Sequence, residues 1–553
     1  MKILIVGGYG VFGGRLAHLL AGHAALDLVI AGRNLAAATR FCAGWHGAAT
    51  LTPLRFDRTA PGAGLADLRP DLVVDASGPF QDYGADPYGL VGAALAVSAD
   101  YIDLADGTAF VAGISRFDAM AKAAGRFVLS GASSFPVLTV AVVRELAQGM
   151  AVTGVTAGIA PSPYAGVGLN VLRAVLGYAG KPVMLRRGGQ DRAATGLGES
   201  RTMVVAVPGS MPLHPLRFSL VEVPDLAVIP ALFPGVTDVW VGAAPQPGLL
   251  LAVLNLMARL RRYGLLPGLS PLAPLCHWLL NRLALGEHRG GMVVKATGLT
   301  PDGATVTRSW HMLAEGDDGP LIPVMAVAAL VAKLVAGQRP APGARAASDM
   351  LTLADYQGQF APLRIVTGFR GGGASLGLWR DVLGPGFDSL PAPLRALHGV
   401  GGQVWQGRAD VTAGPGPLAA LVRRLFGFPR AGQNLPLRFE LQPLAGGGER
   451  WLRHYPGCTM RSDLRPGRGR TLGLIEESFG PIHVAIAILR DGDGISFVTR
   501  RWRLGPLPLP RWALPGGTAR EFDDAGRFGF DIKIRVPLVG LVVAYRGWLV
   551  PAS

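Results

Sequence analysis

The chain has 553 residues, of which 50% are hydrophobic, and its 53 Lys and Arg residues outnumber its 38 Asp and Glu residues to give a net charge of +15. This length predicts two or three domains, and the apolar content excludes a disordered chain. A basic surface is compatible with an anionic membrane, an acidic ligand or a solvated arginine face, but no nucleic-acid motif is visible.

The cysteines and the apolar runs indicate the cellular compartment of the protein. Cys42, Cys276 and Cys458 are far apart in the chain, so neither a disulfide framework nor a metal site is predicted. No run of about 18 apolar residues is present, and the first residues lead directly into a strand pattern, so neither a spanning helix nor a signal peptide is predicted. These features favour a cytoplasmic protein.

The first fourteen residues carry the clearest functional signal. Residues 3–6 are an apolar run typical of a buried parallel strand, and an apolar helical pattern follows from residue 11. Between them, Gly8, Gly10 and Gly13 have G-x-G-x-x-G spacing. Gly8 is expected to make the tight turn, Gly10 to let a pyrophosphate approach the backbone, and Gly13 to let the helix pack on the strand. The pattern predicts a dinucleotide site at the helix N-terminus.

Strand and helix patterns continue to alternate through residues 1–150. Asn34 is expected to cap the helix that follows the second strand. Repeated β-α units predict a parallel sheet with helices on both faces and a ligand at the carboxyl ends of the strands. Further strands are predicted over residues 26–31, 51–57, 71–77, 101–106 and 126–131.

The end of the second strand indicates the type of cofactor. Ala31, Gly32, Arg33 and Asn34 stand there, without the acidic residue that would bond the ribose 2′-hydroxyl of NAD. A guanidinium suits a 2′-phosphate, so Arg33 favours NADP over NAD. The alternative is that Arg33 is a surface residue and the ribose site is unselective.

Gly78, Pro79 and Phe80 form the turn after the fourth predicted strand. This turn is expected beside the nicotinamide half of the cofactor, because Gly78 allows close backbone approach and Pro79 stiffens the loop. Asp103, in the fifth strand, is either a structural partner or a polar wall of the site. No catalytic residue is predicted. The predicted cofactor-binding residues are Gly8, Tyr9, Gly10, Val11, Phe12, Gly13, Arg33, Asn34, Asp57, Ser77, Gly78, Pro79 and Phe80.

These motifs together resemble the saccharopine dehydrogenase-like (saccharopine reductase-like) NADP-binding family. The resemblance rests on the glycine loop, AGRN, VVDASGPF, YIDLAD and SGASSFPVLT, and it covers residues 1–345. It implies a Rossmann-like domain, NAD(P) binding and oxidoreductase chemistry, but it does not fix the substrate. Short-chain dehydrogenases are disfavoured, because none of the ten tyrosines is followed four residues later by Lys.

Residues 151–345 are predicted to form a second, mixed α/β domain. The resemblance implies that its sheet covers the substrate cleft and often contributes to a homodimer. Glu199, Arg201 and Lys295 are polar residues that could reach this cleft, without an assigned role. Strands are predicted over residues 152–160, 217–223, 236–244, 292–299 and 304–313.

Residues 249–285 are unusual, since two short apolar helices, broken near Pro267 and Pro271, carry several arginines. Three alternatives stay open for them. They are ordinary buried helices, they lie peripherally in a membrane interface, or they line a lipid-accepting pocket or a dimer interface.

Residues 346–376 contain Pro, Gly and Ala clusters and are predicted to be a linker. Residues 377–553 are predicted to form a β-rich (α+β) C-terminal domain, a curved antiparallel sheet with a hairpin at residues 491–494. The stretches VLGPGFDSLP, ERWLRHYPG and LIEESFGPIHVAI resemble an uncharacterised domain often fused behind saccharopine dehydrogenase-like domains. Arg453, His454 and Glu476 are expected to face a pocket inside this sheet.

The function that these features predict is an NADPH-dependent reductase of a small or lipid-like substrate, with hydride transfer at the carboxyl edge of the Rossmann-like sheet. No acid/base pair or nucleophile is evident in the sequence. The alternative is therefore a non-catalytic protein that senses NADP(H) or binds lipid, at the membrane surface.

Overall fold

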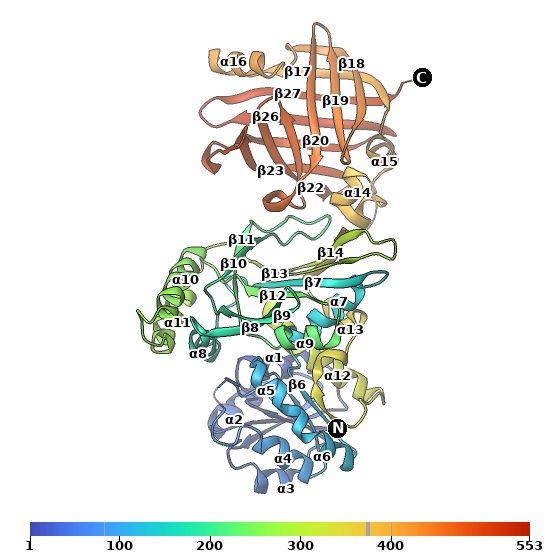
Figure 1. The fold of residues 1–553 in the computed structure, drawn as a ribbon. Helices are drawn as coiled ribbons and strands as arrows, with labels where there is room; N and C mark the ends of the chain where they lie inside the picture. The colour runs from blue at the N-terminus through green and yellow to red at the C-terminus, as the bar shows by residue number, and fades with distance from the viewer. Residues whose placement is uncertain (82, 372–376, 400, 553) are drawn as a thin grey trace. The chain divides into compact units, whose positions relative to one another are not determined.

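The computed structural model describes residues 1–81, 83–371, 377–399 and 401–552 (Figure 1). The chain divides into two compact units. The first contains Met1–Arg201 and Leu216–Val366, and the second contains Thr202–Pro215 and Thr367–Ser553. No helix among the described residues is both long and apolar enough to cross a bilayer.

The N-terminal domain is built on a parallel seven-stranded sheet with the order β15-β6-β5-β4-β1-β2-β3. The chain runs outward from β1 in one direction and from β4 in the other, so the topological switch point lies between these two strands. Residues of β1 such as Ile3, Leu4 and Ile5 are fully buried, as expected for a sheet covered on both faces. The strands are β1 (Lys2–Val6), β2 (Asp27–Gly32), β3 (Thr50–Arg55), β4 (Leu72–Asp75), β5 (Asp100–Asp103), β6 (Phe127–Ser130) and β15 (Gly343–Ala346).

The predicted parallel sheet is confirmed, and each of the six strands predicted in residues 1–150 is present. The helices of this region are α1 (Val11–Leu19), α2 (Leu35–Ala43), α3 (Gly62–Leu68), α4 (Gly89–Ala96), α5 (Thr108–Gly113), α6 (Asp118–Ala123) and α7 (Thr139–Leu146). Asn34 caps α2 as predicted, because its side-chain oxygen accepts a hydrogen bond from the Ala37 N–H at 3.1 Å.

The seventh strand, β15, was not predicted. It is formed by residues that follow the whole second domain, and it pairs in parallel with β6. The predicted linker at 346–376 also contains α13 (Leu353–Phe360) and β16 (Ile365–Gly371), while residues 372–376 lie outside the described part of the chain.

The second sheet is mixed, as predicted, with the order β10-β11-β12-β7-β13-β14-β16. β12 runs parallel to β7, whereas β13 pairs with both β7 and β14 in antiparallel fashion. The hairpin of β8 (Pro182–Arg187) and β9 (Gln190–Thr195) forms a separate two-stranded sheet. The strands of the mixed sheet are β7 (Ala151–Ala160), β10 (Ser200–Met203), β11 (Leu216–Leu220), β12 (Asp238–Ala243), β13 (Arg289–Leu299), β14 (Thr305–Glu315) and β16.

Helices cover one face of this sheet and join it to the first. α7 packs against β13 and β14, and the largely apolar α12 packs against α1 and α13. The helices of this region are α8 (Leu169–Tyr178), α9 (Asp225–Leu232), α10 (Gly248–Arg262), α11 (Ala273–Arg282) and α12 (Ile322–Val335).

Residues 249–285 form two helices, α10 and α11, with a break at the predicted prolines. They are not ordinary buried helices, because many of their large apolar side chains are exposed. Leu249 is 78% exposed, Tyr263 is 79% exposed, and Trp278 is 59% exposed.

The C-terminal domain is a ten-stranded antiparallel barrel, shown in orange to red in Figure 1. The sheet closes because β22 also pairs with β23, and β17 pairs with β27. The predicted curved, β-rich domain is confirmed, and so is the hairpin, in which Asp491 pairs with Gly494. The barrel strands are β17 (Val404–Ala413), β18 (Gly432–Leu444), β19 (Gly448–Tyr455), β20 (Cys458–Pro466), β21 (Ile475–Phe479), β22 (Ile482–Asp491), β23 (Gly494–Leu504), β25 (Gly516–Asp524), β26 (Arg527–Val536) and β27 (Gly540–Pro551).

The remaining elements of this domain are β24 (Leu507–Pro508), α14 (Leu378–Leu383), α15 (Ala392–Gly399) and α16 (Pro417–Leu425).

The three polar residues expected inside this domain do not lie together. Along β19, Arg453 is buried, whereas its neighbour His454 is half-buried on the other face, because successive side chains of a strand alternate. Glu476 pairs with Arg503 at 3.2 Å, whereas the carboxylate 3.7 Å from Arg453 belongs to Glu477. Arg453 therefore lies on the buried side of its strand, whereas His454 and Glu476 do not lie with it, and a pocket at Arg453 stays a prediction.

Candidate functional site

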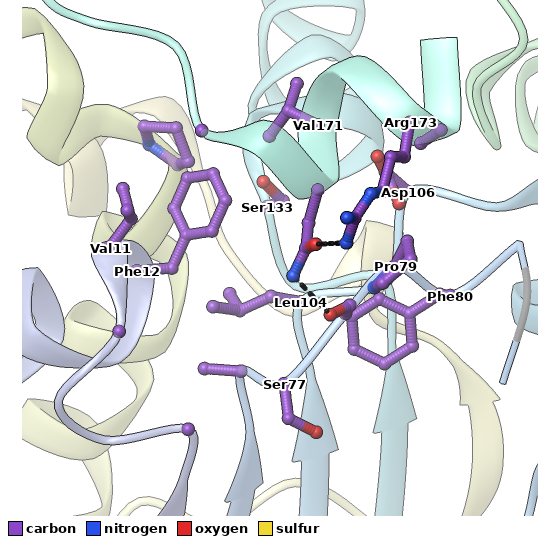
Figure 2. Close-up of a pocket in the computed structure, with 18 of the residues that line it drawn as sticks. Val11, Phe12, Ser77, Pro79, Phe80, Leu104, Asp106, Ser133, Val171 and Arg173 are labelled. Carbon is purple, nitrogen blue, oxygen red and sulfur yellow. Dashed lines mark hydrogen bonds between the residues drawn. The ribbon is translucent and has the colours of Figure 1, made fainter. Parts of the chain in front are cut away.

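A cavity of about 820 Å³ lies in the first unit, where the carboxyl ends of β1, β2 and β4 meet α8 and the ends of β7 and β12. Figure 2 shows Val11 and Phe12 on one side of this cavity and Asp106 and Arg173 on the other. The cavity lies at the switch point of the parallel sheet, where ligands of such folds bind.

The glycine loop after β1 is shaped by close backbone approaches. Gly7 has a φ of +78°, and a Cβ atom on it would lie 2.9 Å from the Ala76 carbonyl oxygen. The motif spacing predicted the tight turn at Gly8, but the structure has it at Gly7. A Cβ atom on Gly13 would lie 2.3 Å from the Gly7 carbonyl oxygen, so the predicted close packing of α1 on the strand is present.

The other two motif glycines differ in their surroundings. A Cβ atom on Gly8 would lie 2.8 Å from the Ile5 carbonyl oxygen and 3.1 Å from the Ile30 Cα atom, so Gly8 serves packing between β1 and β2. Gly10, which immediately precedes α1, lines the cavity. The first N–H groups of α1 lack partners within the helix, so they form an anion-binding end beside the cavity.

Arg33 lies at one end of the cavity, directly after β2, and its side chain is exposed. Tyr9 covers Gly32, where a Cβ atom would lie 2.5 Å from the tyrosine ring, and the Tyr9 hydroxyl accepts a hydrogen bond from the Asn34 N–H at 3.0 Å. Asp57 accepts hydrogen bonds from the N–H and hydroxyl of Thr59, and these bonds lower its pKa.

A hydrogen-bonded group of buried side chains supports the turn after β4. The Asp75 carboxylate accepts hydrogen bonds from the Ser77 hydroxyl at 2.6 Å and from the Tyr83 hydroxyl. The Arg58 guanidinium lies 3.5 Å from the centre of the Tyr83 ring. Burial raises the pKa of Asp75, and these hydrogen bonds oppose that rise. The network fixes Ser77 and the adjoining Gly78 at the cavity wall.

Helix α8 closes the cavity from the second domain. The Asn170 side-chain amide donates a hydrogen bond to the Gly78 carbonyl oxygen at 3.2 Å, and its oxygen accepts one from Arg173 at 3.3 Å (Figure 2). Arg173 therefore presents a positive charge to the cavity, on the side opposite Val11 and Phe12.

Three acidic or phenolic groups that line the cavity lie near one another: Asp106, Tyr178 and Glu222. Asp106 lies on the same side of the cavity as Arg173 (Figure 2). Burial raises the pKa of Asp106, and the nearby charge of Glu222 raises it further, although a hydrogen bond from Gln81 at 3.0 Å opposes this. Burial and the charges of Glu222 and Asp106 raise the pKa of Tyr178. This arrangement can hold a proton on Asp106 at higher pH than an exposed carboxyl can.

Sequence reasoning missed this group. Asp106 follows β5, at the carboxyl edge where a ligand is expected, and this position was a usable signal. Tyr178 at the end of α8 and Glu222 after β11 reach the cavity only through the packing of the second domain. Asp103 is fully buried and accepts hydrogen bonds from Ser130 and Gly131, so it supports the sheet.

The predicted cofactor-binding residues divide into two sets. The cavity brings together Tyr9, Gly10, Val11, Phe12, Arg33, Asp57, Ser77, Gly78, Pro79 and Phe80. Gly8, Gly13 and Asn34 support the loop and the helices beside it and do not line the cavity.

Residues 390–549 match the family model described as "Domain of unknown function (DUF4166)", as the sequence predicted for an uncharacterised C-terminal domain. No curated protein sequence matches the chain.

Among solved structures, the chain is similar to saccharopine dehydrogenase (L-Glu forming) from Saccharomyces cerevisiae, with a TM-score of 0.49 and 14% identity over 67% of this chain and 100% of that chain. It is similar to the WlbA dehydrogenase from Thermus thermophilus in complex with NAD and alpha-ketoglutarate, with a TM-score of 0.28 and 14% identity over 62% and 90% of the two chains. It is also similar to an amine dehydrogenase from Mycobacterium smegmatis, with a TM-score of 0.32 and 11% identity over 63% and 95%.

Proposed function

We propose that this protein is an NADPH-dependent oxidoreductase that reduces a small or lipid-like substrate. The observation that supports this most directly is the composition of one cavity, which is lined by a glycine loop and an exposed guanidinium and has a protonatable carboxyl opposite the loop. Dinucleotide recognition and proton donation then occur within the same space of about 820 Å³.

The residues present fit a dinucleotide. Gly10 leaves room beside the N-terminus of α1, whose N–H groups suit a pyrophosphate. Arg33 stands where a 2′-phosphate would lie, and it suits that group through paired charge-assisted hydrogen bonds. Ser77 and Gly78 also line the cavity, and Gly78 is linked through Asn170 to Arg173, which suits the nicotinamide half.

Bound NADPH would supply the hydride for reduction of a C=O, C=N or C=C bond. Asp106 then donates the proton that balances the hydride, because its raised pKa keeps it protonated more readily than an exposed carboxyl. Arg173, held by Asn170, can bind an anionic group of the substrate. Phe12, Phe80 and Leu104 provide apolar walls for the rest of it.

Cofactor binding is tested by fluorescence titration of the full chain with NADPH and NADH. We expect NADPH to bind more tightly, and we expect Arg33→Ala to abolish that preference. Arg40→Ala is the matched control, because Arg40 is an exposed arginine on α2 that does not line the cavity. Equal binding of both nucleotides by the wild type would contradict the NADP assignment.

Catalysis is tested by following NADPH oxidation with a panel of ketone, imine and enoyl substrates, on the wild type and on Asp106→Asn. We expect turnover with at least one class and a loss of about 100-fold in kcat in the variant, with nucleotide binding retained. Tight NADPH binding without turnover on any class would favour the alternative, a non-catalytic NADP(H)-sensing protein.

We also propose that α10 and α11 bind peripherally to an anionic membrane. Leu249, Leu256, Tyr263, Leu265 and Trp278 are each more than half exposed, which is an unusual concentration of large apolar side chains. Residues 248–286 contain four arginines and no acidic residue. Apolar side chains beside arginines suit the interface of an anionic bilayer. A second copy of a chain with a net charge of +15 suits this basic surface less well.

Co-sedimentation with vesicles of phosphatidylglycerol and phosphatidylcholine tests this contact. We expect binding that weakens as salt increases and as the phosphatidylglycerol fraction falls, and we expect Leu256→Ser with Trp278→Ser to reduce it strongly. Met120→Ser, on α6, removes a similarly exposed apolar side chain and serves as the control. Absence of binding, with concentration-dependent dimerisation that the double variant removes, would assign the surface to a homodimer.

A further inference from the structure

A second, smaller hollow lies on the first unit, with a volume of about 260 Å³. Its walls come from the amino-terminal halves of β7 and β12, from β13, from β8 and from β10. None of its lining residues lines the larger cavity. It contains Arg201 and Lys295, two polar residues that the sequence analysis left without a role.

The sheet register explains how the hollow forms. Trp240, Thr156 and Lys295 are opposite one another on β12, β7 and β13, so their side chains share one face of the sheet. In the adjacent row, Gly154 lies between Asp238 and Thr297. Because Gly154 has no side chain, the floor of the hollow stays open at its centre.

Two of the four cations in the hollow are already neutralised. The Arg187 guanidinium donates to both carboxylate oxygens of Glu199, at 2.8 and 3.4 Å. Arg186 lies 2.8 Å from the Asp191 carboxylate. The hollow's own carboxylate, Asp238, accepts hydrogen bonds from its neighbours and is not paired with an arginine or lysine among the described residues.

The other two cations have no carboxylate partner within ion-pair distance in the described part of the chain. Arg201 donates to the Thr156 hydroxyl at 3.1 Å, and its guanidinium lies 4.9 Å from the centre of the Trp240 ring. Burial and repulsion from Arg187 lower its pKa, whereas the charges of Glu199 and Asp238 oppose that fall. The exposed guanidinium is therefore held against a tryptophan and a hydroxyl, with no carboxylate at ion-pair distance among the described residues. Lys295 adds a second charge from β13, the strand that pairs with β7.

We propose that this hollow is a binding site for a phosphate group, either inorganic phosphate or the phosphate of a small monoester. Arg201 and Lys295 provide two positive charges for the nearly two negative charges of a monoester at neutral pH. The Thr156 hydroxyl accepts from Arg201 and can donate its own proton to a phosphate oxygen. Three donors on three different elements suit a tetrahedral oxyanion better than a planar carboxylate.

The hollow and the larger cavity are bordered by two of the same strands, β7 and β12. β7 and β12 line the hollow through Thr156 and Trp240, and the same two strands line the larger cavity through Ile159 and Ala243. At about 260 Å³ the hollow is too small for a dinucleotide, so it is a separate site and does not depend on the function proposed above.

Calorimetric titration of the full chain with inorganic phosphate, at constant ionic strength, tests the site, with acetate as the carboxylate probe. We expect saturable binding of phosphate, and we expect Arg201→Gln and Lys295→Gln each to weaken it about tenfold. Arg192→Gln changes an exposed arginine of β9 outside the hollow and is expected to bind phosphate like the wild type.

Three results would overturn the proposal. They are no saturable binding of phosphate, equal weakening in the Arg192→Gln control, and binding of acetate as tight as that of phosphate. If Arg201→Gln fails to fold, the exposed Lys295 provides the decisive variant, because its replacement removes charge without disturbing the packing of the sheet.

Discussion

The side-chain amide of Asn170 donates a hydrogen bond to the backbone carbonyl oxygen of Gly78, 92 residues earlier in the chain. One residue lies in α8, and the other lies in the turn that follows β4. The hydrogen bond therefore links two parts of the main cavity's lining, α8 and the turn after β4. The orientation of α8, and with it the position of Arg173, therefore depends on a turn of the N-terminal domain.

Asn170→Ala is expected to weaken NADPH binding about fivefold, because the loss of one such hydrogen bond costs about 1 kcal/mol. Asn170→Asp tests the two hydrogen bonds of this side chain separately. Its ionised carboxylate can still accept a hydrogen bond from Arg173, but it cannot donate one to the Gly78 carbonyl oxygen. We expect it to bind NADPH as weakly as Asn170→Ala in a fluorescence titration. Wild-type affinity in both variants would show that the bond does not position the site.

Gly13→Ala is expected to abolish nucleotide binding and to lower the melting temperature. The new Cβ atom would lie 2.3 Å from the Gly7 carbonyl oxygen, a backbone atom that can move only if the glycine loop moves. Gly22→Ala is the control, because no atom lies within 4 Å of a Cβ atom at that position. Calorimetric melting and NADPH titration of both variants check this, and NADPH binding by Gly13→Ala would contradict it.

Tyr83→Phe is expected to reduce the free energy of unfolding by about 2 kcal/mol, because it removes a donor from the buried carboxylate of Asp75. Tyr88→Phe is the comparison. The Tyr88 hydroxyl also donates to a buried acceptor, but that acceptor is the neutral Phe110 carbonyl oxygen at 3.0 Å, so its loss is expected to cost about 1 kcal/mol. Equal losses in urea unfolding would show that the charge of Asp75 is unimportant.

The protein is expected to lose stability as the pH rises from about 4 to about 7 through its buried aspartates. Burial raises the pKa of Asp225 to about 7, from an ordinary value of 3.8, and the Thr139 hydroxyl lowers it only in part. Between these values the folded state keeps a proton that the unfolded state has released. The group therefore opposes folding progressively, by at most about 1.4 kcal/mol per pH unit, and the loss levels off above pH 7.

Asp225→Asn removes this titration, so urea unfolding at pH 5, 6, 7 and 8 is expected to show a shallower decline in the variant. Asp103, whose pKa burial also raises to about 7, keeps part of the decline in place. Parallel profiles for the two proteins would show that Asp225 is ionised in the folded state at acidic pH.

Much of the fold could be predicted because its signals are local. The apolar run before the glycine loop and the hairpin at Asp491 are determined by residues close together in the sequence. β15 could not be predicted, because its residues Gly343–Ala346 have little intrinsic strand preference and become a strand only by pairing with β6. Barrel closure was missed for a similar reason, since it depends on pairing between β17 and β27.

The site divides in the same way. The side of the cavity formed by the glycine loop was predicted because a glycine motif and its flanking arginine lie within one β-α-β unit. The side formed by Asp106, Tyr178 and Glu222 was not, because these residues come from different elements and have no shared spacing. Their chemistry arises from burial, which the sequence does not show directly. The tight turn was assigned to Gly8 and not to Gly7 because either glycine suits a turn in sequence terms. Only the backbone conformation distinguishes them.

The pairing of β17 with β27 also constrains how the C-terminal domain can be made. β17 is the first barrel strand to leave the ribosome, and β27 is the last. Until β27 has been synthesised, β17 and β26 each present an open edge with unpaired N–H and C=O groups, which can recruit strands of other chains. A frameshift or nonsense mutation shortly before residue 540 would therefore leave an aggregation-prone open sheet, although most of the domain's residues would be present.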